Sequence, residues 1–148
     1  MTQTLTNFLN GVKNKEYATK NGTHIHNILQ HVVIDGDITK GDTDMIETIS
    51  KHNELKPWFC ANAQTEVPIA GVLNGRFTSR RIDRMIKDDV LQTIKFVDYK
   101  TDTTKTDFIE KYIRQIKEYA ELLHSAYPNY KISGFILWVH DWQIEQIV

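Results

Sequence analysis

Apolar residues recur at helical spacing in three segments of the chain. In residues 23–34 and 43–55 they return every three or four positions, and residues 107–127 carry a wider stripe of the same kind. Asp35-Gly36, Pro57 and Pro128 end these segments in turn. The pattern predicts three helices, the last of them the longest.

Shorter extended segments fill the remaining length. Asn74-Gly75 lies inside one of them, so we expect that strand to be broken or bulged. Asp88-Asp89 has the composition of a tight hairpin turn. The strands that we predict are residues 65–69, 72–77, 80–87, 90–100, 131–139 and 142–148.

The order of these elements is helix, helix, several strands, long helix and two strands. That order favours a mixed α/β domain with a central sheet flanked by helices. A chain of 148 residues without repeats or low-complexity tracts is long enough for one domain with a real core. We therefore expect residues 1–148 to form a single domain, with residues 1–21 as a flexible or partly ordered lead-in.

Composition excludes several classes of protein. Hydrophobic residues make up 41% and charged residues 25%, as in ordinary globular proteins. No apolar run approaches the roughly 18 residues that cross a bilayer, and residues 1–20 lack the apolar centre of a signal peptide. One cysteine, Cys60, leaves no internal disulfide and no four-cysteine cluster. We expect a cytoplasmic protein with no membrane partner.

Charge is more informative locally than globally. The formal net charge of −1 does not indicate a nucleic-acid partner. Residues 76–87, however, hold five cations and a single carboxylate, which is either a phosphate-binding cleft or a strand with ordinary surface charges. The cations are Arg76, Arg80, Arg81, Arg84 and Lys87, and the carboxylate is Asp83.

The segment Phe96-Val97-Asp98-Tyr99-Lys100 carries the candidate chemistry. Side chains alternate along a strand, so Asp98 and Lys100 point to the same face, either as a structural ion pair or as a reactive one. Asp83 lies in the neighbouring predicted strand, where a hairpin would bring it beside Asp98. Two adjacent carboxylates repel unless a cation lies between them, and Mg²⁺ or Mn²⁺ fits such oxygen ligands.

The spaced pattern Asp83…Asp98-Tyr99-Lys100 resembles the PD-(D/E)xK nuclease signature. More closely, the chain is similar to the nuclease domains of the RecB and AddA/AddB recombination enzymes over about residues 22–139. This resemblance implies a restriction-endonuclease-like fold. The further matching segments are Gly22-Thr23-His24-Ile25-His26-Asn27-Ile28-Leu29-Gln30, Glu66-Val67-Pro68, Arg81-Ile82-Asp83-Arg84 and the pair Gln115 and Tyr119.

The resemblance also implies a metal site. Asp83 and Asp98 would be the main ligands of Mg²⁺ or Mn²⁺, with the carbonyl of Tyr99 as an extra one. His26 would be a further ligand, favoured over His24 by its distance from Gly22, although helical histidines are often structural. Lys100 would be the catalytic or charge-stabilising lysine.

Other residues are implied less directly. Glu66 would orient a water or complete the metal shell, or it simply ends a strand before a proline. Gln115 and Tyr119 share a helix face and would lie near the active site, although Tyr119 also fits the apolar core. The residues expected to bind nucleic acid are Arg76, Arg80, Arg81 and Arg84.

The function that the resemblance implies is metal-dependent hydrolysis of DNA phosphodiester bonds, with exonuclease action. No G-x-x-x-x-G-K-[ST] loop of a helicase motor is present. The sequence fits a stand-alone nuclease, or a domain of a longer parent chain with a helicase motor or further domains as partners. The alternative is a non-catalytic DNA-binding or scaffolding module, and cleavage of RNA also stays open.

Overall fold

The fold is centred on a mixed five-stranded sheet with the strand order β3-β4-β5-β6-β7. Our computed structural model describes residues 22–103 and 105–148. β5 and β6 are parallel, and the other neighbouring strands are antiparallel. The strands are β3 (Gln64–Leu73), β4 (Arg76–Asp88), β5 (Thr93–Lys100), β6 (Lys131–Trp138) and β7 (Gln143–Gln146).

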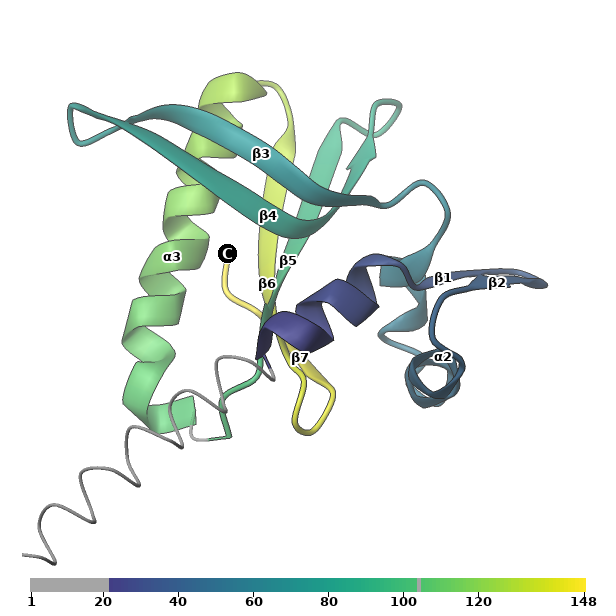
Figure 1. Ribbon diagram of the computed structural model, residues 1–148. Helices are drawn as coiled ribbons and strands as arrows, with labels where there is room; N and C mark the ends of the chain where they lie inside the picture. The colour runs from purple at the N-terminus through teal and green to yellow at the C-terminus, as the bar shows by residue number, and fades with distance from the viewer. Residues whose placement is uncertain (1–21, 104) are drawn as a thin grey trace, which may run out of the picture.

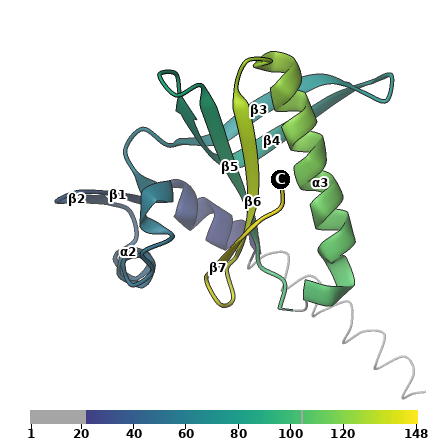
Figure 2. The same cartoon turned by 180° about the vertical axis from the view of Figure 1, so that it is seen from behind.

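Helices cover both faces of this sheet. The long helix α3 (Lys105–Ala126) packs on one face. The other face carries the helix over residues 22–30, α2 (Thr43–Ser50) and a 3₁₀ helix (Lys56–Phe59), as Figures 1 and 2 show. The predicted α/β architecture, a mixed central sheet flanked by helices, is confirmed.

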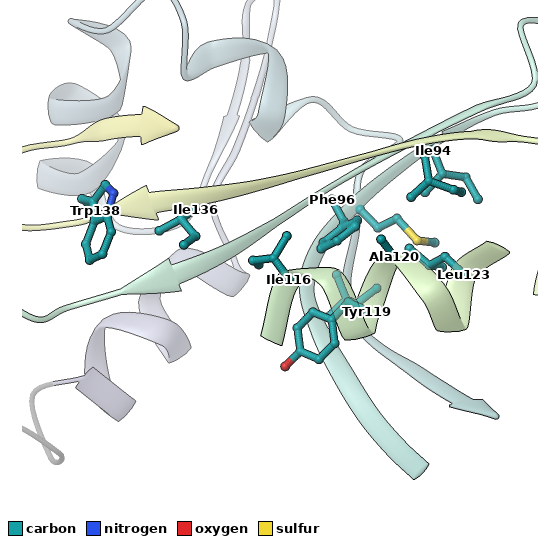
Figure 3. Packing of buried hydrophobic residues seen from close by; sticks show 11 residues of the cluster. Ile94, Phe96, Ile116, Tyr119, Ala120, Leu123, Ile136 and Trp138 are labelled. Carbon is teal, nitrogen blue, oxygen red and sulfur yellow. The ribbon is translucent and has the colours of Figure 1, made fainter. Parts of the chain in front are cut away.

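The core on the α3 side is a continuous apolar layer. Ile116, Tyr119, Ala120 and Leu123 of α3 pack against strand residues such as Phe96 (Figure 3). Gly134 of β6 allows this close approach, because a Cβ atom there would lie 2.5 Å from Cζ of Phe96. The apolar residues that recur at helical spacing in the sequence are therefore the ones that bury α3 against the sheet.

α3 forms the crossover between β5 and β6. Parallel neighbours cannot be joined by a tight turn, so the chain leaves the end of β5, returns through α3 and enters β6 in the same direction. This route places the first half of α3 near the carboxyl end of β5, where Lys100 lies.

The first two predicted helices end earlier than expected. Residues 33–35 form strand β1 (Val33–Asp35), which pairs with β2 (Ile38–Lys40) around Gly36-Asp37. Gly at the first central position of a two-residue turn, after β-branched residues, favours such a hairpin over a helix. α2 ends at Ser50, and Pro57 lies in the first turn of the 3₁₀ helix.

The hairpins of the main sheet also differ from the prediction. Asn74-Gly75 does not interrupt a strand; it is the two-residue turn between β3 and β4, with Leu73 paired to Arg76. Both turn residues have positive φ, 51° and 76°, as a tight Asn-Gly hairpin requires. The turn between β4 and β5 is longer than two residues, since Asp88 pairs with Thr93.

In the part of the chain that the structure describes, no helix is both long enough and apolar enough to cross a membrane.

Candidate active site

The β4–β5 pairing opens at the two aspartates. The last paired residues are Arg84 and Val97, and Asp83 and Asp98 follow on the two strands. Beyond that point a side chain replaces the backbone ladder: Oδ2 of Asp83 accepts a hydrogen bond from the N–H of Tyr99 at 2.7 Å. Asp83 is 9% exposed and Asp98 is 5% exposed. Two carboxylates thus lie side by side and are largely shielded from solvent.

Asp98 is short of partners for a buried carboxylate. Nζ of Lys100 lies 2.6 Å from Oδ2 of Asp98, so the two form the ion pair expected from strand alternation. This ion pair is the close polar contact of Oδ2, which has no further hydrogen-bond partner among the described residues. Burial, and next the charge of Asp83, raise the pKa of Asp98 to about 7.

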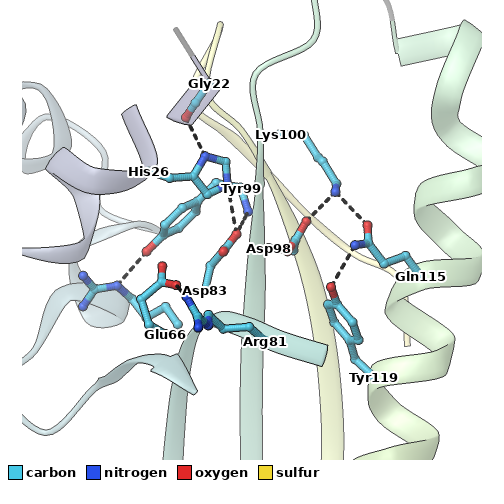
Figure 4. A network of polar contacts seen from close by, with 11 residues as sticks. Gly22, His26, Glu66, Arg81, Asp83, Asp98, Tyr99, Lys100, Gln115 and Tyr119 are labelled. Carbon is cyan, nitrogen blue, oxygen red and sulfur yellow. Dashed lines mark hydrogen bonds and ion pairs between the residues drawn. The ribbon is translucent and has the colours of Figure 1, made fainter. Parts of the chain in front are cut away.

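Lys100 is held in place from α3. Its Nζ donates a hydrogen bond to Oε1 of Gln115 at 2.7 Å, and Nε2 of Gln115 donates to the hydroxyl of Tyr119 at 2.8 Å (Figure 4). Tyr119 is 4% exposed and packs in the core, and its hydroxyl also accepts the hydrogen bond from Gln115. Tyr119 therefore belongs to the apolar core and to the hydrogen-bond chain that leads to Lys100. The Gln-x-x-x-Tyr pair therefore contacts the lysine strand.

His26 reaches the aspartates from the opposite face of the sheet. Its Nδ1–H donates to the carbonyl of Gly22 at 2.7 Å, and its Nε2 lies 3.3 Å from Oδ2 of Asp83. Burial alone lowers the pKa of this imidazole, but the hydrogen bond and charge of Asp83 outweigh burial and raise it to about 9. The same pairing with His26 outweighs the burial of Asp83 and lowers its pKa. His24 is exposed and lines a shallow surface hollow instead.

Glu66 lies opposite Asp83 in the β3–β4 register, between the pairs Thr65–Arg84 and Val67–Ile82. Its backbone has φ of 52°, which is unusual for a residue with a side chain and interrupts the pairing there. Its Oε2 lies 3.4 Å from Nη1 of Arg81. Strained backbone of this kind concentrates at functional sites, and Glu66 borders this one.

Arg84 does not face solvent, so its predicted contact with nucleic acid is wrong. It is 1% exposed. Its Nε donates to the hydroxyl of Tyr99 at 2.8 Å, and its Nη2 donates to the carbonyls of Leu29 at 2.8 Å and Val32 at 3.3 Å. The guanidinium also lies 4.3 Å from the ring centre of Phe59. Arg84 thus clamps the helix that carries His26 onto the strands that carry the aspartates.

This clamp is the residue role that the sequence did not reveal. Its only signal is a charged residue at the alternate strand position between Ile82 and Ile86. The other three predicted arginines, Arg76, Arg80 and Arg81, are exposed on the β3–β4 hairpin.

The donor set suits a hard divalent cation, although the described residues contain no group of three or more His, Cys, Asp and Glu side chains already gathered around one point. Mg²⁺ needs only one or two carboxylates, because water and phosphate supply its other ligands. Asp83 and Asp98 would provide these. His26 has its Nδ1–H fixed by a backbone carbonyl, as metal-binding histidines commonly do, with Nε2 toward the carboxylates.

The carbonyl of Tyr99 points toward the same space. In a strand the N–H and C=O of one residue point the same way, and the N–H of Tyr99 bonds to Asp83. The carbonyl of Lys100 points the other way, to Val139 of β6. The residues expected to hold a metal therefore lie near one another where β4 and β5 separate.

No protein-family model matches this chain, and no curated protein sequence matches it.

Proposed function

We propose that this protein is a metal-dependent nuclease that hydrolyses phosphodiester bonds in DNA, in the manner of the RecB-like PD-(D/E)xK nucleases that its motifs resemble. The observation that carries the proposal is the buried pair Asp83 and Asp98 with Lys100 beside it. Two buried carboxylates in one site cost stability even with Lys100 and His26 beside them, and a cation site would explain why they are there.

Each side chain has a part that follows from its contacts. Asp83 and Asp98 would hold Mg²⁺ or Mn²⁺, with His26 and the carbonyl of Tyr99 as further ligands. When bound, the metal would neutralise charge on the phosphate and make a water molecule more acidic. Lys100 would then stabilise charge on the phosphate or orient the attacking water, because Gln115 keeps its ammonium group in place.

Gln115 and Tyr119 act through Lys100. They form a chain of hydrogen bonds from the core to the ammonium group, and they do not need to touch the substrate. Glu66, at the rim, would orient a water beside Asp83. The proposed activity is exonucleolytic: the protein would act at DNA ends, either alone or with a helicase motor as partner.

The test is cleavage of linear and circular DNA with Mg²⁺, Mn²⁺ or EDTA. We expect wild-type protein to degrade linear DNA only when metal is present, and Asp98→Asn to lose at least about 100-fold in rate. This variant has nearly the same shape as Asp98, so its fold should persist. Asp37→Asn, on the exposed β1–β2 turn, is the matched control and should cleave like wild type.

Three outcomes would contradict the proposal. Cleavage that continues in EDTA would exclude the metal mechanism. Metal-dependent cleavage that is equal in wild type and Asp98→Asn would place the activity elsewhere. Folded wild-type protein that binds DNA but never cleaves it would favour the non-catalytic module, and a matched RNA substrate tells a deoxyribonuclease from a ribonuclease.

A further inference from the structure

The β3–β4 hairpin exposes large apolar side chains outside the candidate active site. It extends past α3 as a two-stranded arm (Figure 1). Val72 is 63% exposed and Phe77 is 76% exposed, and these two residues pair directly across the hairpin. An exposed aromatic ring at such a place needs an explanation other than folding.

Only one face of this hairpin contributes to the core. Gly71 lies against Leu122 of α3, Leu73 is buried, and Arg80 lies 3.8 Å from Glu118 of α3. The alternating side chains on the opposite side, which we call the outer face, are all exposed. They are Pro68, Ala70 and Val72 of β3 and Phe77, Ser79 and Arg81 of β4.

The charge of the hairpin contrasts with that of the chain. Residues 67–82 contain three arginines and no acidic residue, while the whole protein has a formal net charge of −1. Arg81 is the arginine of the outer face, and its side chain is 69% exposed. The outer face therefore combines the positive charge of Arg81 with the aromatic ring of Phe77 and with small side chains.

The outer face leads to the aspartates. Phe77, Ser79, Arg81 and Asp83 occupy alternate positions of β4, and Arg81 contacts Glu66, the residue opposite Asp83. At about 3.3 Å per residue, Phe77 lies roughly 20 Å from Asp83 along the strand. A flexible polyanion lying on the outer face would reach the carboxylates with one end.

We propose that the outer face of the β3–β4 hairpin binds an unpaired DNA strand, with Phe77 stacking on a base and Arg81 contacting a phosphate. This inference rests on the proposed function, since it supplies the track that feeds the site. Stacking on a protruding aromatic ring requires a base that is free of its partner strand, and arginine beside aromatic residues is the usual composition of such surfaces.

The experiment measures binding separately from cleavage. A fluorescein-labelled oligothymidine of about 20 nucleotides, long enough for one such surface, is titrated by anisotropy in EDTA with the Asp98→Asn protein. Adding Phe77→Ala should weaken binding about 5- to 100-fold, the range for the loss of one stacked base. Adding Phe77→Trp should preserve binding. Leu91→Ala, an equally exposed apolar residue on the β4–β5 turn, is the control and should have no effect.

Each other result has a definite meaning. Equal affinity of the proteins with and without Phe77→Ala overturns the inference, as does an equal loss of binding to a blunt duplex of the same length. A wild-type dimer in sedimentation that Phe77→Ala converts to a monomer, with unchanged DNA binding, would show a protein contact instead and also overturn it. Phe77-dependent binding without any cleavage would support the inference and contradict the proposed function. Metal-dependent cleavage without Phe77-dependent binding would support the proposed function and contradict the inference.

Discussion

At the scale of single residues, the candidate site is built against stability. Asp98 is buried beside Asp83, and one of its oxygens has no hydrogen-bond partner among the residues described. Local rules of folding are broken in this way mainly where function requires it. The cost falls on the metal-free protein, because a cation would compensate both carboxylates.

Removing the charge of Asp98 should therefore stabilise the metal-free protein. We expect Asp98→Asn in EDTA to gain on the order of 2 kcal/mol in the free energy of unfolding, or roughly 5 °C in Tm. Mn²⁺ should raise the Tm of wild type and leave that of the variant unchanged. Thermal unfolding with Asp37→Asn as the exposed control measures both effects; a variant that unfolds below wild type in EDTA would refute this account.

Residue patterns predicted part of this site. Strand alternation placed Asp98 and Lys100 on one face, and helical spacing placed Gln115 and Tyr119 together; both arrangements are present. The burial of Arg84 could not be predicted, because its partners are backbone carbonyls of Leu29, Val32 and Trp58, which have no signature in a sequence. The sequence alone does not distinguish a buried arginine from an exposed, DNA-binding one when both lie in a basic segment.

At the scale of elements, the sequence located the long helix and the segments that form the main sheet, but it missed β1 and β2 and misplaced the turns. A run such as residues 31–34 satisfies helical spacing and β propensity at once, and the Asp35-Gly36-Asp37 turn decides for the hairpin. The Asn74-Gly75 pair carries the same signal between β3 and β4. The spacing of apolar residues indicates which side chains are buried. It does not tell a short strand from the end of a helix unless the turn residues that follow are also considered.

The packing of α3 on β6 gives a prediction at this scale. A Cβ at Gly134 would lie 2.7 Å from Cγ2 of Ile116, which is adjacent to Gln115. We expect Gly134→Ala to cost about 1–3 kcal/mol through overpacking and to slow cleavage by shifting Gln115 from Lys100. Urea unfolding and cleavage rates measure the two effects.

Gly36→Asn is the control for this substitution, because Gly36 has open space around it and a positive φ of 60° that Asn tolerates. It should change neither stability nor rate appreciably. A Gly134→Ala protein with wild-type stability would show that α3 can move away from the sheet without penalty.

At the scale of the whole molecule, the distribution of charge over the surface matters more for DNA binding than the net charge. The chain is close to neutral, but the hairpin is locally basic, so attraction to DNA should be short-ranged and sensitive to salt. If Arg81, the arginine of the outer face, neutralises one phosphate of a single strand, the logarithm of the binding constant should fall with the logarithm of salt concentration with a slope of about −0.7 or steeper.

Anisotropy titrations at increasing salt, in EDTA, measure this slope. Arg81→Gln should reduce its magnitude by about 0.7, the share of one phosphate contact on a single strand. Lys95→Gln, exposed on β5, is the control for removal of a positive charge elsewhere and should leave the slope unchanged. A slope near zero for wild type would exclude an electrostatic track on the hairpin.

The site draws its residues from four separate segments: the helix over residues 22–30, β4, β5 and α3. Contacts between segments this distant in sequence form only after long loops of chain have closed. While the ribosome is still making α3, Asp83, Asp98 and Lys100 exist, but nothing yet positions the ammonium group. With the proposed function, the nuclease would stay harmless to the nucleic acids around it until synthesis has passed residue 119 and the crossover has closed.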